Sequence, residues 1–146
     1  NTHLAIGVRG EALAVKYLAQ IGFRLVATNF TTPIGYSNIG RAITGEVDLI
    51  AYDEQQHPFT LSFIEVKTRT SVDYATPQSA VDRQKQRHII KAARVYRRSL
   101  GVETEPFRYD VVSILSLSNT PPQIQLLKGY FTEQGFTKST WLHRSF

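Results

Sequence analysis

The sequence predicts an α/β fold in which helices pack on a mixed central sheet. Three observations lead to this prediction. A segment with helical spacing comes first, three strand-like segments follow it, and a long amphipathic segment then precedes a further strand. The order helix, three strands, helix, strand is typical of a mixed sheet flanked by helices.

The first half of the chain supplies the first helix and the three strands. Ala, Leu and Val dominate the helical segment, and Gly22 follows where a helix is expected to stop. Residues 31–42 contain Pro33 and two glycines, a composition that favours a loop. The predicted elements are a helix over residues 4–20 and strands over residues 23–30, 44–52 and 59–68, with a connection of hairpin length before the last.

The second half begins with the longest predicted helix, over residues 77–100. Pro77 lies near its first turn and Gly101 lies just past its end, which is the usual placement of these residue types. A strand rich in Val and Ile is predicted over residues 107–116, and a short last strand over residues 123–128. We expect one domain over residues 1–146, with a core at about residues 4–117 and a weakly patterned tail at residues 118–146.

Composition limits the functions to be considered. At 146 residues and 42% hydrophobic content, the chain fits one ordinary globular domain. It has no cysteine, which excludes disulfides and thiolate metal sites. No apolar run approaches the roughly 18–20 residues of a membrane span. We therefore expect a cytoplasmic protein with no membrane partner.

Positive charge is concentrated in one segment. The net charge is +5 and the pI about 9.6, which favours a polyanionic partner. Seven of the seventeen Lys and Arg residues lie between Arg83 and Arg98. On a helical wheel, five of them fall within roughly 80° and could follow a phosphate backbone. These candidate nucleic-acid-binding residues are Arg83, Arg87, Lys91, Arg94 and Arg98; the alternative is a solvated helix face.

Two neighbouring predicted strands carry charged residues that are costly to bury alone. Asp48 lies in one of them, and Glu65 and Lys67 lie in the other. The two-residue period of a strand places Glu65 and Lys67 on one face, about 6.5–7 Å apart. If the strands pair, Asp48 reaches the same place. Two carboxylates and an ammonium suit a hard divalent cation and the water that it activates.

Each of these residues also has a structural interpretation. Asp48 could pair with Lys67 or Arg69 across a hairpin. Glu46 lies on the same strand face as Asp48 and could exchange roles with it. As a functional group, Lys67 would position the attacking water and stabilise negative charge on a phosphoryl group; as a structural one, it would only form a salt bridge.

Two helices contribute further candidates. Glu11 is the one charge on the inward face of the first predicted helix, shared with Ala14 and Leu18. The alternative is a Glu at the helix edge that is solvated or paired with an arginine. Lys85 projects from the apolar side of the later helix, near its start, where it could reach the carboxylates.

Taken together, these segments resemble the bacterial YraN family, which is similar in turn to the PD-(D/E)xK nuclease superfamily. The resemblance is closest to archaeal Holliday junction resolvases and RecB-type nuclease domains, and it covers about residues 5–117. The matching segments are Gly10-Glu11, residues 45–50 (GEVDLI), residues 63–69 (FIEVKTR), residues 80–82 (AVD) followed by Lys85, and residues 107–112 (FRYDVV).

The resemblance implies a restriction-endonuclease-like core of order αβββαβ. It implies that Asp48, Glu65 and the Val66 carbonyl bind Mg²⁺ or Mn²⁺, that Lys67 orients the water, and that Glu11 completes the acidic cluster. The implied reaction is hydrolysis of phosphodiester bonds by a metal-bound water. The stretch at residues 31–44 is longer than the family pattern leads us to expect.

Three functions remain in competition. The first is a metal-dependent endonuclease acting on DNA, with branched or Holliday-junction-like substrates in repair or recombination. Since a junction has two-fold character, a homodimer would suit it. The second is a catalytically inactive nucleic-acid-binding module of the same fold. The third is a protein whose basic helix binds an acidic partner, for which binding to nucleic acid would fail at any salt concentration.

Overall fold

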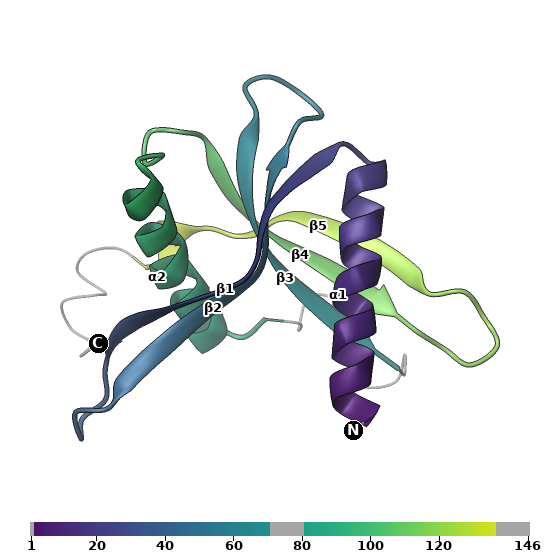
Figure 1. Ribbon diagram of the computed structural model, residues 1–146, viewed down its shortest axis with the longest axis horizontal. Helices are drawn as coiled ribbons and strands as arrows, with labels where there is room; N and C mark the ends of the chain where they lie inside the picture. The colour runs from purple at the N-terminus through teal and green to yellow at the C-terminus, as the bar shows by residue number, and fades with distance from the viewer. Residues whose placement is uncertain (1, 71–80, 137–146) are drawn as a thin grey trace.

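Two helices cover opposite faces of a five-stranded mixed sheet (Figure 1) in the computed structural model, which describes residues 2–70 and 81–136. The order of elements is the predicted αβββαβ followed by the last strand expected after it, which is consistent with a restriction-endonuclease-like core. The elements are α1 (Thr2–Gln20), β1 (Phe23–Tyr36), β2 (Ala42–Asp53), β3 (Thr60–Arg69), α2 (Arg83–Leu100), β4 (Phe107–Leu115), β5 (Gln123–Phe131) and the short 3-10 helix η2 (Glu133–Gly135).

The sheet has the strand order β1-β2-β3-β4-β5. Its neighbouring strands are antiparallel except for β3 and β4, which run parallel and are joined through α2. A parallel pair needs such a crossover, because the chain must return to the same end of the sheet. No helix in the described part of the chain is long and apolar enough to cross a membrane.

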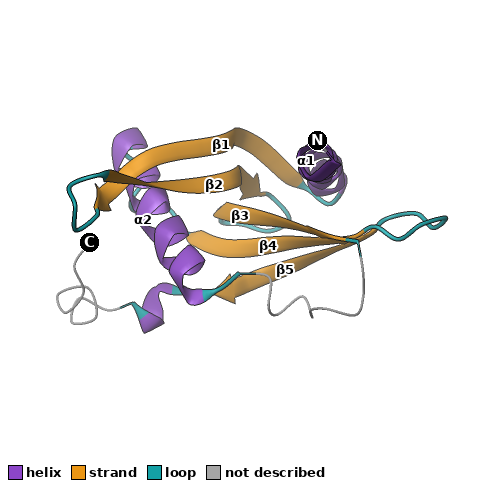
Figure 2. Cartoon of the chain, turned by 90° about the horizontal axis from the view of Figure 1, so that it is seen from below, coloured by secondary structure: helices purple, strands orange, loops and turns teal. Residues whose placement is uncertain are grey.

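The alternation of side chains along the strands gives each helix its own core. Ala14 and Leu18 of α1 pack in one cluster with strand residues such as Ile64. Ile89 and Ala93 of α2 belong to a second cluster on the other face, and Figure 2 shows α2 lying across the strands. Phe63, which precedes Ile64 on β3, belongs to the α2 cluster, because successive side chains of a strand point to opposite faces of the sheet.

The predicted loop over residues 31–42 is wrong for most of its length. β1 continues to Tyr36, and only residues 37–41 form the turn to β2. Pro33 faces Thr44 in this pairing. A proline is tolerated there because β1 is an edge strand and can lack a donor on its open side.

The later elements differ from prediction at their ends. α2 begins at Arg83, because Asp82 caps it with a side-chain oxygen that accepts from the Lys85 N–H at 2.8 Å. Gly101 ends the helix in the left-handed conformation, as expected. Pro77 and the start predicted for this helix lie outside the described residues. The last strand runs three residues further than predicted, to Phe131.

The strands separate into a fork at the centre of the sheet. β2 pairs with β1 along nearly its whole length, but with β3 only from Leu49 to Asp53. β3 meanwhile stays paired with β4 as far as Arg69. Figure 1 shows the result: the β1–β2 hairpin leaves the sheet on one side, next to α2, and β3 and β4 leave on the other, next to α1. This opening we call the fork.

Candidate metal-binding site

Asp48 lies at the point where the fork opens. The β2–β3 ladder ends at Leu49 and Ile64, and Asp48 is the next residue outwards on β2. Its Oδ2 accepts the N–H of Val66 at 2.8 Å. The Asp48 side chain thus takes the place of a main-chain carbonyl as the acceptor for Val66. This hydrogen bond holds the Asp48 carboxylate beside the segment of β3 that carries Glu65.

Glu65 is the most buried carboxylate in the fork, with 6% of its surface exposed. Its Oε2 lies 3.2 Å from the Lys85 Nζ. Its Oε1 is buried, and no hydrogen-bond donor from the described residues reaches it. Burial, followed by the charge of Asp48, raises the pKa of Glu65 to about 8, although Lys85 acts in the opposite direction. An ionised Glu65 therefore requires more positive charge than Lys85 supplies.

Lys85 reaches the fork from the first turn of α2, where the sequence placed it as a candidate. Burial lowers the pKa of its ammonium group, but the neighbouring carboxylates, Glu65 above all, outweigh this and raise it overall. About half of the Lys85 side chain remains exposed. The ammonium is therefore charged, accessible and close to the position where a cation would bind.

Lys67 follows Glu65 by two residues on β3 and is exposed. By the strand period it shares a face with Glu65. In the parallel pairing it lies opposite Ser113 of β4. Its side chain is therefore next to the carboxylates and open to solvent, where a substrate could approach.

Glu11 comes from α1, on the opposite side of the sheet from Lys85. Burial and then the charge of Asp48 raise its pKa, whereas a side-chain hydrogen bond from Asn29 lowers it. Asn29 occupies the position on β1 opposite Asp48, between the pairs Thr28–Leu49 and Phe30–Val47. Its φ is +50°, a left-handed conformation that asparagine tolerates better than most residues. Sequence reasoning missed Asn29, since it shows no pattern within its strand.

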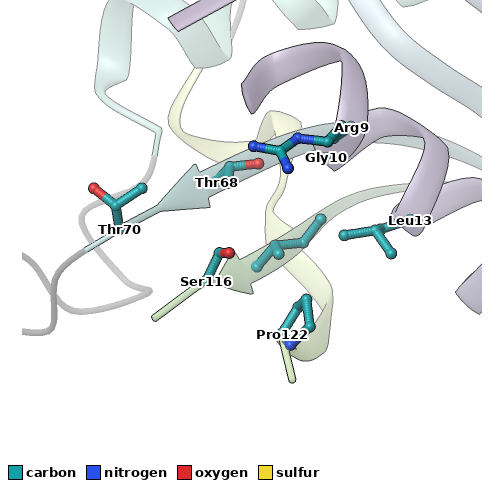
Figure 3. Close-up of a pocket in the computed structure, with 8 residues that line it drawn as sticks. Arg9, Gly10, Leu13, Thr68, Thr70, Ser116 and Pro122 are labelled. Carbon is teal, nitrogen blue, oxygen red and sulfur yellow. The ribbon is translucent and has the colours of Figure 1, made fainter. Parts of the chain in front are cut away.

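A close approach of α1 to β3 brings Glu11 to the fork. A Cβ atom on Gly10 would lie 2.2 Å from the Thr68 Oγ1, so a larger residue there would force the Thr68 side chain to move. A hollow of about 160 Å³ lies beside this contact. Figure 3 shows the residues that line it, with the Arg9 side chain extending towards Thr68. The hollow therefore marks where α1 crosses the end of β3.

The fit to a divalent cation rests on oxygen ligands. The unpartnered Oε1 of Glu65 and the adjacent Asp48 carboxylate are hard donors of the kind that Mg²⁺ prefers. Among residues 2–70 and 81–136, no three Asp, Glu, His or Cys side chains already surround a common metal position. The donor set thus fits a cation held by two carboxylates, a backbone carbonyl and waters, with Glu11 outside that set.

The basic face of α2 is partly occupied by the segment that follows β5. Arg83 donates to the Gly135 carbonyl at 2.6 Å and lies over the ring of Phe136. Arg94 pairs with Glu133 at 2.6 Å. The five predicted residues therefore do not form one continuous solvated stripe. Arg98, at the end of α2, is exposed.

Glu133 is the centre of this contact, and nothing in its local sequence indicated such a role. Its Oε2 accepts the hydroxyl of Tyr109 at 2.6 Å and lies 3.7 Å from Arg97. Arg97 is buried and lies over the Phe107 ring. Burial and the bond to Glu133 raise the pKa of Tyr109. The network joins α2, β4 and the segment after β5.

The sequence that forms the fork matches one protein family. Residues 10–114 match the family described as "Uncharacterised protein family UPF0102". A UPF0102 protein of Solibacter usitatus is 39% identical over 122 residues, which cover 84% of this chain and 82% of that protein. One of Geobacter sulfurreducens is 39% identical over 86% of this chain and 88% of its own length. One of Chlorobium limicola is 36% identical over 94% and 92%. These names state no activity.

Proposed function

We propose that this chain, which belongs to the uncharacterised protein family UPF0102, is a divalent-metal-dependent endonuclease that hydrolyses phosphodiester bonds in DNA. One observation carries the proposal. Glu65 is buried beside a second carboxylate, with one oxygen that no donor in the described residues satisfies. When both carboxylates are ionised, such a pair is unfavourable unless a cation beyond Lys85 joins it. The resemblance to PD-(D/E)xK nucleases adds support of a different kind.

Each residue of the fork has a role in this proposal. Asp48, Glu65 and the Val66 carbonyl would hold Mg²⁺ or Mn²⁺, which when bound supplies Lewis acidity and a water of lowered pKa. Lys67, exposed on the same strand face, would orient that water and stabilise charge on the phosphoryl oxygens. Glu11 would act from the α1 side through the electrostatics of Asp48.

Lys85 would change partner when the site is filled. Its Nζ lies 3.2 Å from the Glu65 Oε2, so it offsets the same charge that a metal ion would offset. A cation at Glu65 repels the ammonium, which is half-exposed and can turn to a substrate phosphate. Lys85 would thereby help to bind the DNA backbone.

Charge and fold support a nucleic-acid substrate. The chain carries a net charge of +5, and α2, with seven Lys and Arg residues between Arg83 and Arg98, borders the fork. Branched DNA, such as a four-way junction bound by a homodimer, is the substrate suggested by the likeness to junction resolvases.

A second candidate is a catalytically inactive nucleic-acid-binding module. Two observations favour it. No three-residue metal cluster is preformed among the described residues, and Lys85 already neutralises part of the charge of Glu65. In that case the carboxylates would stabilise the fold at the fork and the basic residues alone would act.

Cleavage of labelled single-stranded, duplex, flap and four-way-junction DNA, with Mg²⁺ or Mn²⁺, separates the two candidates. We expect the wild type to cut at least one substrate and both Asp48→Asn and Glu65→Gln to lose about 10²-fold or more in rate. Glu103→Gln, which removes an exposed charge beyond α2, is the matched control and should cut normally. Salt-sensitive binding without cutting in any metal would reject the nuclease and favour the binding module.

A further inference from the structure

A small basic pocket lies between α2 and the outer end of the β1–β2 hairpin. It has a volume of about 140 Å³ and opens to solvent. One wall consists of strand residues, and the other consists of two turns of the helix. The described residues that line it are Ile34, Gly35, Ile43, Gln84, Arg87, His88 and Lys91.

The helix wall carries all the polar side chains of the pocket. Arg87, His88 and Lys91 supply cationic or titratable nitrogens, and Gln84 supplies an amide. None of the described lining residues is acidic. Three cationic or titratable groups and one amide around a small space, with a neutral opposite wall, form a site that suits a single compact anion.

The electrostatics show that these groups repel one another. Burial, followed by the charges of Arg87 and Arg94, lowers the pKa of Lys91 to about 8. Burial, followed by Lys91, Arg87 and Lys85, also lowers the pKa of His88, which Asp82 offsets only in part. An anion in the pocket would relieve this repulsion and favour the protonated forms of both residues.

The strand wall limits what can enter. Gly45 packs under α2, where a Cβ atom would lie 2.8 Å from the His88 carbonyl oxygen and 3.2 Å from the Ala92 Cβ. The helix therefore lies close against the hairpin, and only the space beside Ile34 and Ile43 remains open. That space is large enough for a tetrahedral phosphate group, and the nitrogens of the helix wall favour an anion over a neutral base or sugar.

The pocket is also next to the fork. Lys85 contacts Glu65, and His88 follows Lys85 by three residues of α2, a rise of about 4.5 Å. A nucleic-acid strand with one phosphate at Asp48 and Glu65 can therefore reach the pocket with a neighbouring phosphate.

We infer that the pocket formed by Gln84, Arg87, His88 and Lys91 is a second phosphate subsite, which binds a phosphodiester group of the same nucleic-acid strand next to the phosphate at the fork. The inference rests on the proposed nuclease function and adds to it a means of fixing the register of the strand. The inferred site is more local than the candidate basic stripe, of which Arg83 and Arg94 contact the segment after β5. Arg87 also lies over the Phe136 ring of that segment, at 5.8 Å from its centroid, and lines the pocket from the helix.

The first test uses the wild-type protein and inorganic phosphate, without DNA or metal. The ring signals of His88 are followed by NMR over a pH titration with and without phosphate. We expect phosphate to raise the pKa of His88, and not to displace the ring signals of His57, which is exposed in the β2–β3 connection. An equal shift of both histidines, or of neither, would overturn the subsite.

The second test compares two charge-removing variants in metal-free binding to the preferred DNA. Lys91→Gln alters the pocket, whereas Lys16→Gln removes an exposed charge of α1 outside it. Circular dichroism melting first establishes that both fold. We expect Lys91→Gln to weaken binding roughly tenfold and to reduce the slope of log K against log salt by about 1. Equal effects of the two variants would overturn the subsite.

The outcomes keep the two proposals apart. If the wild type cuts DNA, and phosphate leaves His88 unmoved, the nuclease stands and the subsite is rejected. If phosphate shifts His88 selectively and Lys91→Gln weakens binding, yet no metal supports cutting, the subsite stands and the nuclease is rejected.

Discussion

The carboxylate of Asp48 accepts the N–H of Val66 at 2.8 Å, in the position where a strand neighbour would otherwise supply a carbonyl. Because Val66 is the residue that follows Glu65 on β3, this hydrogen bond holds the Asp48 carboxylate close to Glu65. The charge of Asp48 therefore acts directly on the protonation of Glu65. The hydrogen bond from Val66 needs only an acceptor oxygen at residue 48 and does not depend on that charge.

Asp48→Asn separates these two effects. Asparagine can still accept from Val66 but has no charge, so the pKa of Glu65 should fall below its value of about 8. Side-chain carboxyl NMR of the metal-free protein measures this. Asp48→Ala removes the acceptor as well and should be less stable than Asp48→Asn by about 1 kcal/mol. A Glu65 pKa that is unchanged in both variants would contradict the arrangement.

The raised pKa of Glu65 predicts how stability depends on pH. Between the ordinary value of 4.5 and about 8, the folded protein holds a proton that the unfolded chain has released. The contribution of Glu65 is therefore fully present below pH 4.5 and is lost as pH rises through about 8.

Denaturant unfolding at a series of pH values tests this prediction. The free energy of unfolding of the metal-free wild type should fall over that interval, by an amount on the order of a few kcal/mol. Glu65→Gln should flatten the profile and Glu103→Gln should not. Added Mg²⁺ should stabilise the wild type more at alkaline than at acidic pH, because it binds the ionised carboxylate.

Gly10 and Gly7 form a matched pair on α1. Replacing a helical glycine by alanine ordinarily stabilises a protein by about 1 kcal/mol, and Gly7→Ala should do so because its Cβ meets nothing within 4 Å. Gly10→Ala should instead destabilise by roughly 1–3 kcal/mol, since its Cβ meets the Thr68 Oγ1 at 2.2 Å.

Thermal melting compares the two glycine variants. The double variant Gly10→Ala/Thr68→Ala removes the clashing oxygen and should recover much of the loss. Gly10→Ala alone should also reduce cleavage, because α1 carries Glu11. Equal stabilisation by both single variants would show that α1 does not press on β3.

Asn29 has a backbone role and a side-chain role that two substitutions distinguish. Asn29→Gly retains easy access to a φ of +50°, whereas Asn29→Ala does not and should be less stable by about 1 kcal/mol. Both variants remove the hydrogen bond to Glu11, so the pKa of Glu11 should rise further in each. NMR titration of Glu11 tests the second point, and a fall in either variant would contradict it.

Sequence patterns predicted those parts of the fold and of the site that depend on residues close together in the chain. The strand pattern around Asp48 and Glu65 and the helical position of Lys85 were sufficient to bring these residues together. The position of Asn29 depends on strand register, and that of Glu133 depends on a tertiary contact across the sheet, so neither left a local pattern. Pro33 was misleading, because only its place in an edge strand permits the longer hairpin.

The contacts of Glu133 tie the segment after β5 to β4 and α2. A fragment ending at residue 117 would keep all the candidate metal ligands and both helices, and it would include the whole of the family match. It would nevertheless leave β4 without its partner β5, and Tyr109 and Arg97 without Glu133. Excision of the motif-bearing core should therefore give an aggregating polypeptide, since a bare apolar strand edge invites pairing between chains.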